Sequence, residues 1–172
     1  AISDVLPAAA TVFVRVHDPN RLEFVRREIL DLDPAHTSTT TPAELTIPVI
    51  YDGPDLVEVA ERVGLEPDEV VERHQATAHR VQFCGFSPGF GYIGGLDPIL
   101  HLPRRSSPRP RVPAGSVSIA GAYSAVYPTS TPGGWHLIGR TELTLFDPAW
   151  FEQGRPPALL QPGLASRFEA VG

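Results

Sequence analysis

The segment Phe83–Pro148 reads FCGFSPGFGYIGGLDPILHLPRRSSPRPRVPAGSVSIAGAYSAVYPTSTPGGWHLIGRTELTLFDP and carries the features that decide the fold. Thirteen of the chain's 15 glycines lie at or after Gly85, so turns are far denser here than before it. Short β-type runs separated by Gly and Pro turns are typical of a barrel or sandwich. We therefore predict a β-barrel-like domain over residues 80–172, with strands near 80–84, 116–119, 123–127, 135–138, 142–146 and 167–171.

Residues 1–79 show a different pattern, which predicts a small α/β domain. Alternating valines indicate a half-buried strand at 11–16, and Asp18-Pro19 is a typical helix start. A second strand is expected at 45–51, where Pro48 favours an edge position or a bulge. The fold class is thus α+β, with the first domain also containing helices at 53–64 and 67–74.

Composition narrows the range of functions. The 172 residues carry a net charge of −6, which argues against general nucleic-acid binding. All 14 basic residues are Arg, so mechanisms that need a Walker-loop lysine, a Schiff-base lysine or a Ser-Lys dyad are excluded. No apolar run approaches the ~20 residues of a membrane span, and we expect no membrane association. The single cysteine suits a protein of the reducing cytoplasm.

Three motifs that suggest catalysis have structural alternatives. Gly85-Phe86-Ser87-Pro88-Gly89 matches the G-x-S-x-G nucleophile elbow, but Pro88 lacks the backbone N–H that the oxyanion hole needs. We interpret it as a structural turn. Cys84 is expected to be a small core residue rather than a nucleophile. His74 is interpreted as a packed histidine and kept as a candidate general base. The histidine spacings predict no metal site.

Arginines make up the strongest electrostatic feature. Arg104, Arg105, Arg109 and Arg111 are interleaved with prolines, which restrict where the guanidiniums can point. Such a loop suits a carboxylate or phosphate site, and equally a solvated loop that docks on an acidic surface. Further on, Trp135 and Arg140 flank one short predicted strand. If they share a cavity, they supply a stacking wall and an anionic anchor; otherwise Trp135 is core.

As a set, the motifs GFSPGFGYIGGLD, PRRSSPRPRVPAGSVSIAG and TPGGWHLIGRT resemble the family that comprises allophanate hydrolase subunit 1, the B-type subunit of 5-oxoprolinase and the sporulation kinase inhibitor. The resemblance implies a cyclophilin-like β-barrel after a small α/β domain. It also implies a partner of the allophanate hydrolase subunit 2 or 5-oxoprolinase C-type kind, and in the 5-oxoprolinase system a third, lactam-hydrolase subunit. Such a hetero-oligomer opens 5-oxo-L-proline to L-glutamate with ATP. Because this chain has no Lys, we expect the nucleotide to bind mainly on a partner.

Two departures from the family pattern stand out. Family members carry several tens of residues before the VLPAAATVFV segment, so we expect that the first segment of the α/β domain is missing here. Thr131 stands where the family usually has Ser. Carried over position by position, the resemblance gives candidate catalytic residues Arg140, Ser116 and Tyr127, and candidate substrate-binding residues Phe86, Pro88, Phe90, Tyr92, Arg104, Arg109 and Trp135.

Three functional hypotheses follow. The leading one is a subunit of an ATP-dependent amide or lactam hydrolase, of the 5-oxoprolinase or allophanate hydrolase type, that is active only with its partners. The second is a binding module that inhibits a histidine kinase and catalyses nothing. The third is half of a biotin-dependent carboxyltransferase acting on urea-like amides.

Overall fold

A computed structural model describes residues 2–33 and 44–172. The chain divides into two compact units, whose bounds are Ala1–Pro42 and Ala43–Gly172. We expected the division between 79 and 80, so the observed boundary differs. The reason is strand pairing: β3 (Glu44–Val49) pairs in parallel with β11 (Ala165–Ala170), near the end of the chain. Residues 44–79 therefore belong with the second part of the sequence.

The first unit is a hairpin followed by a helix. β1 (Ile2–Pro7) pairs antiparallel with β2 (Val12–Val16), and α1 spans Leu22–Leu30. As predicted, a helical segment starts at Asp18-Pro19: the Asp18 carboxylate accepts the backbone N–H of Asn20, which begins the 3₁₀ turn η1 (Pro19–Arg21). In this unit Val25 is the one buried hydrophobic residue among those described.

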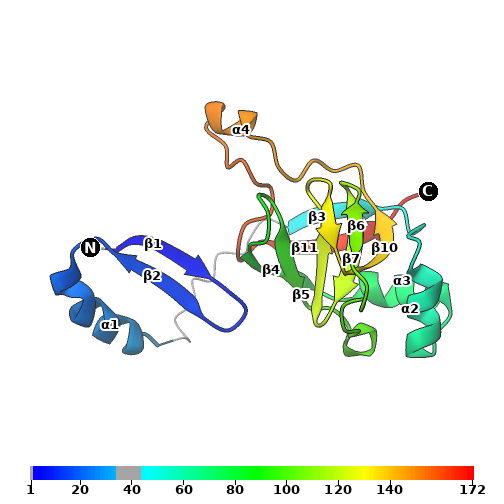
Figure 1. The fold of residues 1–172 in the computed structure, drawn as a ribbon, viewed down its shortest axis with the longest axis horizontal. Coiled ribbons are helices and arrows are strands. Elements are labelled where there is room, and N and C mark those ends of the chain that lie inside the picture. The colour runs from blue at the N-terminus through cyan, green and yellow to red at the C-terminus, as the bar shows by residue number, and fades with distance from the viewer. Residues whose placement is uncertain (1, 34–43) are drawn as a thin grey trace. The chain divides into compact units, whose positions relative to one another are not determined.

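The second unit is built on a seven-stranded sheet with the order β10-β7-β8-β5-β4-β11-β3 (Figure 1). The sheet closes on itself just after β3, where Ile50 and Arg140 exchange two backbone hydrogen bonds of 2.9 Å. This confirms the predicted barrel and the α+β class, and Pro48 lies on the last strand of the order, as expected. The remaining strands of this sheet are β4 (His79–Cys84), β5 (Gly91–Gly94), β7 (Ser116–Ala120), β8 (Tyr123–Val126) and β10 (His136–Arg140).

Two helices follow β3 and pack against the barrel. α2 (Leu56–Val63) contacts β10, and α3 (Pro67–Ala76) contacts β11. Both helices lie where the sequence predicts them. Gly64 ends α2 with a left-handed φ of 71°, which a side chain disfavours, and a capping box between Glu66 and Glu69 begins α3.

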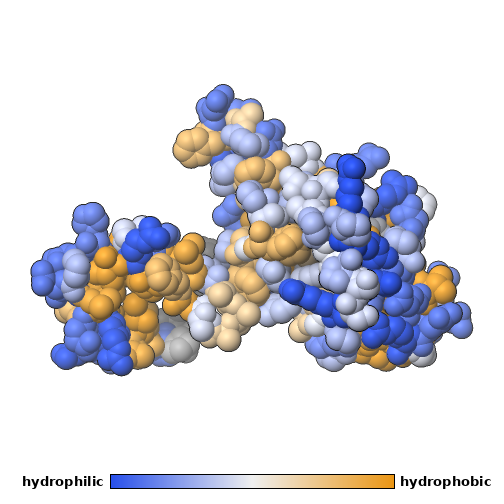
Figure 2. Space-filling view, viewed as in Figure 1, coloured by the Kyte–Doolittle hydropathy of each residue, from blue (hydrophilic) through white to orange (hydrophobic). Residues whose placement is uncertain are grey.

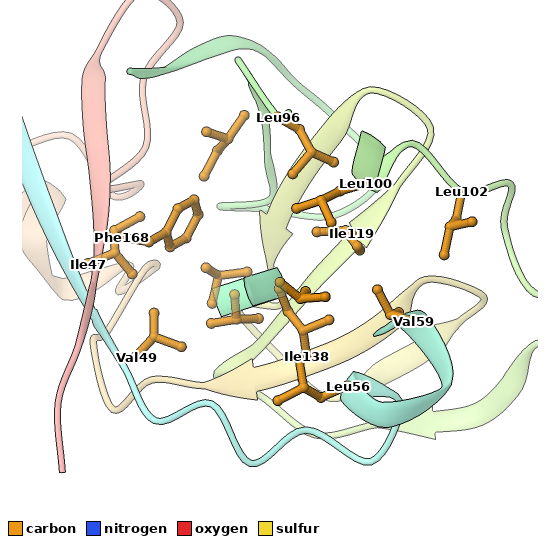
Figure 3. Packing of buried hydrophobic residues seen from close by; sticks show 14 of the residues in the cluster. Ile47, Val49, Leu56, Val59, Leu96, Leu100, Leu102, Ile119, Ile138 and Phe168 are labelled. Atoms are coloured by element: carbon orange, nitrogen blue, oxygen red, sulfur yellow. The ribbon is translucent and has the colours of Figure 1, made fainter. Parts of the chain in front are cut away.

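Apolar side chains from most strands fill the barrel. Ile47 on β3, Phe168 on β11 and Ile138 on β10 point into one interior, toward which Leu56 of α2 also turns (Figure 3). A second buried cluster is more aromatic and contains Phe90, Tyr127 and Trp135. This second cluster forms the base of the candidate site.

The strand prediction was wrong at one place and missed four strands, one of which is β1. Residues 142–146 form no strand; Phe146 alone makes an isolated bridge, to Ala158. Gly and Pro residues hid β5 and the small sheet that pairs β6 (Arg109–Val112) with β9 (Thr131–Gly133). The other short elements are η2 (Pro98–Leu100) and α4 (Ala149–Glu152), the latter on a loop that projects from the barrel (Figure 1).

Candidate functional site

An aromatic pocket of about 240 Å³ opens beside the loop that follows β4. We call it the aromatic pocket, because five aromatic rings line it. The rings come from that loop, from β5, from the end of β8 and from the start of β10. Its other walls are Pro108 and the segment 132–134, and Arg104 is the charged residue that lines it. The rings are Phe86, Phe90, Tyr92, Tyr127 and Trp135, all of them predicted site residues.

Phe90 is the centre of this wall. Its ring makes edge-to-face contacts with Tyr92, Tyr127 and Trp135, at centroid separations of 5.2, 5.3 and 5.6 Å. Edge-to-face pairs add about 0.5–1.5 kcal/mol beyond area burial, and Phe90 is fully buried. The wall is therefore fixed before any ligand arrives.

Phe86 occupies an unusual turn at the rim of the pocket. Its φ is +72°, and the Ser87 N–H donates to the Gly85 carbonyl at 2.9 Å, a three-residue turn around Phe86. The Phe86 side chain is 62% exposed, with its ring 5.2 Å from that of Phe90. A strained backbone thus presents an apolar ring to solvent at the entrance.

Arg104 and Tyr127 give the aromatic pocket its polar groups. The Arg104 guanidinium lies over the Trp135 ring, 5.9 Å from its centroid. Burial raises the pKa of Tyr127 above its usual value, so its hydroxyl, like that of any tyrosine at neutral pH, keeps its proton and can donate a hydrogen bond. A Cβ added to Gly133 would overlap that hydroxyl, so a side chain here would displace Tyr127. This arrangement can hold a small planar ring that carries an anionic group.

Three more of the predicted residues line a second pocket, of about 430 Å³, that we call the arginine pocket. Arg140, Ser116 and Arg109 line it, together with Arg111 and Asp52. The predicted catalytic residues are therefore divided between two pockets, because Tyr127 faces the aromatic one. Pro88 is exposed and lines neither pocket.

Asp55 fixes two of the arginines and was missed by the sequence analysis. Its buried carboxylate accepts from Arg109 Nη2 at 2.6 Å, from Arg105 Nη1 at 3.1 Å and from the Leu137 backbone N–H at 2.7 Å. Arg105 also donates to Glu58 at 2.6 Å, a hydrogen bond that lowers the pKa of that carboxyl. The proline-broken arginine loop is thus partly docked on acidic groups of α2 and the residue before it, one of the two expected alternatives.

Three candidates from the sequence lie elsewhere. His74 is fully buried between the Tyr51 hydroxyl, at 2.7 Å, and the Ser124 hydroxyl, at 2.9 Å, which places it in the core. Cys84 is exposed and not a core residue, because it ends β4; partial burial nevertheless raises the pKa of its thiol. Ser87 Oγ is buried without a hydrogen-bond partner among the described residues, so none of them supplies the base that a nucleophile elbow requires.

Across residues 2–33 and 44–172, no cluster of three or more His, Cys, Asp or Glu side chains is placed to bind a metal ion. Within the same ranges, no helix has the length and apolar character of a membrane span.

Comparison with known proteins identifies the family. The model of the carboxyltransferase domain, subdomains C and D, matches residues 1–160. The chain belongs to this family. The carboxyltransferase domain C/D match covers the first unit, the second unit as far as residue 160 and all the residues that line the two pockets, and it confirms the resemblance drawn from the motifs.

The chain is similar to the B-type subunit of 5-oxoprolinase from Escherichia coli O157:H7, at 43% identity over 97% of this chain and 77% of that protein. It is 50% identical to the corresponding 5-oxoprolinase subunit from Bacillus subtilis, over 73% of this chain and 52% of that protein. A conserved uncharacterized protein from Pyrococcus horikoshii has a similar structure, with a TM-score of 0.68 and 36% identity over 99% of this chain and 79% of the other. The chain therefore spans from half to about three quarters of these carboxyltransferase-domain relatives.

Proposed function

We propose that the protein is a subunit of a 5-oxoprolinase-type lactam hydrolase and that its aromatic pocket binds the cyclic amide acid. The observation that carries this proposal is the pairing of a fixed aromatic wall with Arg104. A five-membered lactam is planar enough to lie against a ring, and its carboxylate suits a guanidinium. The names of the curated relatives agree with such a ligand.

Each residue of the aromatic pocket has a defined task in this proposal. Trp135 and Phe90 contact the faces and edges of the lactam ring and exclude water. Arg104 pairs with the carboxylate and thereby orients the ring. Tyr127, whose pKa is raised by burial, donates a hydrogen bond to the lactam oxygen of the bound substrate and so holds that oxygen in position for activation.

The complete reaction requires partners. ATP transfers its terminal phosphoryl group to the lactam oxygen, water then adds to the activated carbon, and the carbon–nitrogen bond breaks. Hydrolysis of the resulting acyl phosphate releases L-glutamate and phosphate, with ADP from the first step. We expect a protein of the subunit 2 or 5-oxoprolinase C-type kind and a lactam-hydrolase subunit to complete the assembly, which is cytoplasmic in this proposal.

The test is release of ADP and glutamate from 5-oxo-L-proline and ATP by the partner subunits, with and without this protein. Turnover only when the protein is added supports the proposal. Arg104→Gln is expected to raise KM for 5-oxo-L-proline at least tenfold, because it loses an ion pair to the carboxylate. Arg167→Gln, an exposed arginine outside both pockets, is the matched control.

The same test also bears on the two alternative functions. An intact complex without turnover, or with turnover independent of this protein, contradicts the lactam hydrolase. Biotin-dependent carboxylation of a urea-like amide would then support the carboxyltransferase hypothesis, and inhibition of a histidine kinase would support the binding module.

A further inference from the structure

The arginine pocket is a separate cavity with its own chemistry. The same two segments, 104–111 and 132–140, supply both pockets, but different residues of each segment line them. Among the described residues that line the arginine pocket none is aromatic, and this pocket is the larger of the two. A ligand bound there is recognised by charge and hydrogen bonds rather than by stacking.

Positive charge is concentrated in this pocket although the chain is acidic. Arg109, Arg111 and Arg140 line it, and Asp52 is the one carboxylate among its described lining residues. The whole chain carries a net charge of −6, so the excess of positive side chains in this pocket is opposite in sign to the net charge of the chain. Strongly hydrophilic side chains gather over β6 and β10 (Figure 2), the two strands that carry these arginines.

Guanidinium donors remain free in the arginine pocket. Arg140 uses Nε for Asp52, at 2.9 Å, and Arg111 uses Nε for the Ser130 hydroxyl, at 3.0 Å. Within the described part of the chain, the terminal nitrogens of both side chains have no hydrogen-bond partner. Arg109 donates to Asp55 through Nη2, while its Nη1 is buried and finds no partner among the same residues. These unused donors are available to an acceptor with several oxygens.

The pocket is also held in shape by the fold. The Asp55 carboxylate fixes Arg109, and the barrel closure between Ile50 and Arg140 fixes the backbone of Arg140. Ser116 at the start of β7 is buried and adds a hydroxyl to the wall. A site whose donors are already oriented loses little conformational entropy when a ligand binds.

We infer that the arginine pocket binds a phosphate-type polyanion, with Arg111 and Arg140 contacting its oxygens. A carboxylate has two oxygens, which a single guanidinium satisfies in bidentate fashion, whereas three separated arginines suit the many oxygens of a di- or triphosphate. The inference does not require the lactam hydrolase proposed above, because it concerns equilibrium binding to this protein alone.

The experiment is isothermal titration of the intact protein with pyrophosphate at constant ionic strength. Saturable binding at one site per chain is expected. Arg111→Gln and Arg140→Gln should each weaken binding at least tenfold. Arg167→Gln should bind normally; its side chain is 54% exposed, close to the 52% of Arg140, so it controls for the loss of a surface charge.

A gain of affinity provides a second readout. Asp52→Asn removes the carboxylate that lines the pocket and frees Arg140 Nε, so pyrophosphate should bind several-fold more tightly. Equal affinity in Arg111→Gln, Arg140→Gln and the unchanged protein would overturn the inference. Sodium chloride that displaces bound pyrophosphate while the total ionic strength is held constant would also overturn it, because the site would then not distinguish a polyphosphate from a simple anion.

Two further ligands distinguish the sources of the phosphate groups. If ATP binds more tightly than pyrophosphate, the site takes a nucleotide; if pyrophosphate binds equally well, it takes phosphate chains in general, and both results support the inference. Adenosine that binds as tightly as ATP contradicts it. Failure of lactam turnover remains distinguishable, since these titrations contain neither partner subunits nor lactam.

Discussion

At the scale of single residues, Phe86 combines backbone strain with exposure. Its φ of +72° is a conformation that costs a residue with a Cβ about 1–2 kcal/mol, yet its ring is largely in solvent. Core packing therefore does not account for the turn. Its position at the entrance of the aromatic pocket makes ligand contact the natural reason for keeping it.

Two variants separate strain from contact at Phe86. Phe86→Gly and Phe86→Ala both lose the ring, but only glycine adopts the positive φ freely. We expect the glycine variant to unfold with a free energy about 1 kcal/mol higher than the alanine variant, measured by urea denaturation. Both variants should bind 5-oxo-L-proline more weakly than the unchanged protein. Equal stability of the two variants would show that the turn is unstrained.

At the scale of elements, Asp55 joins α2 to the strands of both pockets. Its carboxylate lies immediately before α2, accepts from Arg109 on β6, and accepts from the Leu137 N–H on β10. Loss of its charge leaves a partly buried guanidinium without this ion pair, which is costly because a desolvated charge then has no compensating partner.

We expect Asp55→Asn to lower the free energy of unfolding by about 2–3 kcal/mol, below the full cost of breaking a buried pair because Arg105 and Arg109 are partly exposed. Asp52→Asn is the control: its pair with Arg140 is about half exposed on both sides, and its loss should cost less than about 1 kcal/mol. Chemical denaturation measures both. Similar effects of the two substitutions would refute the linking role of Asp55.

At the scale of the whole molecule, a buried polar network links α3 to the barrel. His74 on α3 contacts Tyr51, which follows β3, and Ser124 on β8, and its carbonyl is hydrogen-bonded to His79 of β4 at 2.7 Å. Complete burial lowers the pKa of His74 to about 3, and burial also lowers the pKa of His79. The folded protein keeps His74 neutral where the unfolded chain, with a pKa near 6.5, is protonated.

Stability should therefore fall as the pH falls from about 6.5 toward 3. In that window the unfolded chain binds a proton that the folded protein does not, which costs up to about 1.4 kcal/mol per pH unit for this histidine. Above pH 6.5 the contribution is constant. We expect His74→Gln, although less stable at pH 7, to lose stability less steeply in acid than the unchanged protein. Identical slopes for the two proteins would exclude this origin of acid sensitivity.

Local signals allowed α1, α2, α3 and most strands to be predicted from the sequence, whereas α4 was missed. α2 and α3 are recognisable because proline starts and a glycine stop bound an apolar stripe. β5, β6 and β9 were missed because their Gly and Pro residues are typical of turns, and only pairing with neighbouring strands makes them extended. Residues 142–146 alternate like a strand, but within the described part of the chain they pair only through the bridge of Phe146.

The sequence by itself determined the barrel class, the family and the residue types of both pockets, because glycine spacing, aromatic content and the arginine run are local properties of the chain. Only the tertiary structure decided that the candidate residues form two pockets rather than one. The assignment of Arg104 to the aromatic pocket and of Arg109, Arg111 and Arg140 to the arginine pocket depends on closure of the barrel and on the ion pairs of Asp55. These contacts join residues that are tens of positions apart, and no local pattern specifies them.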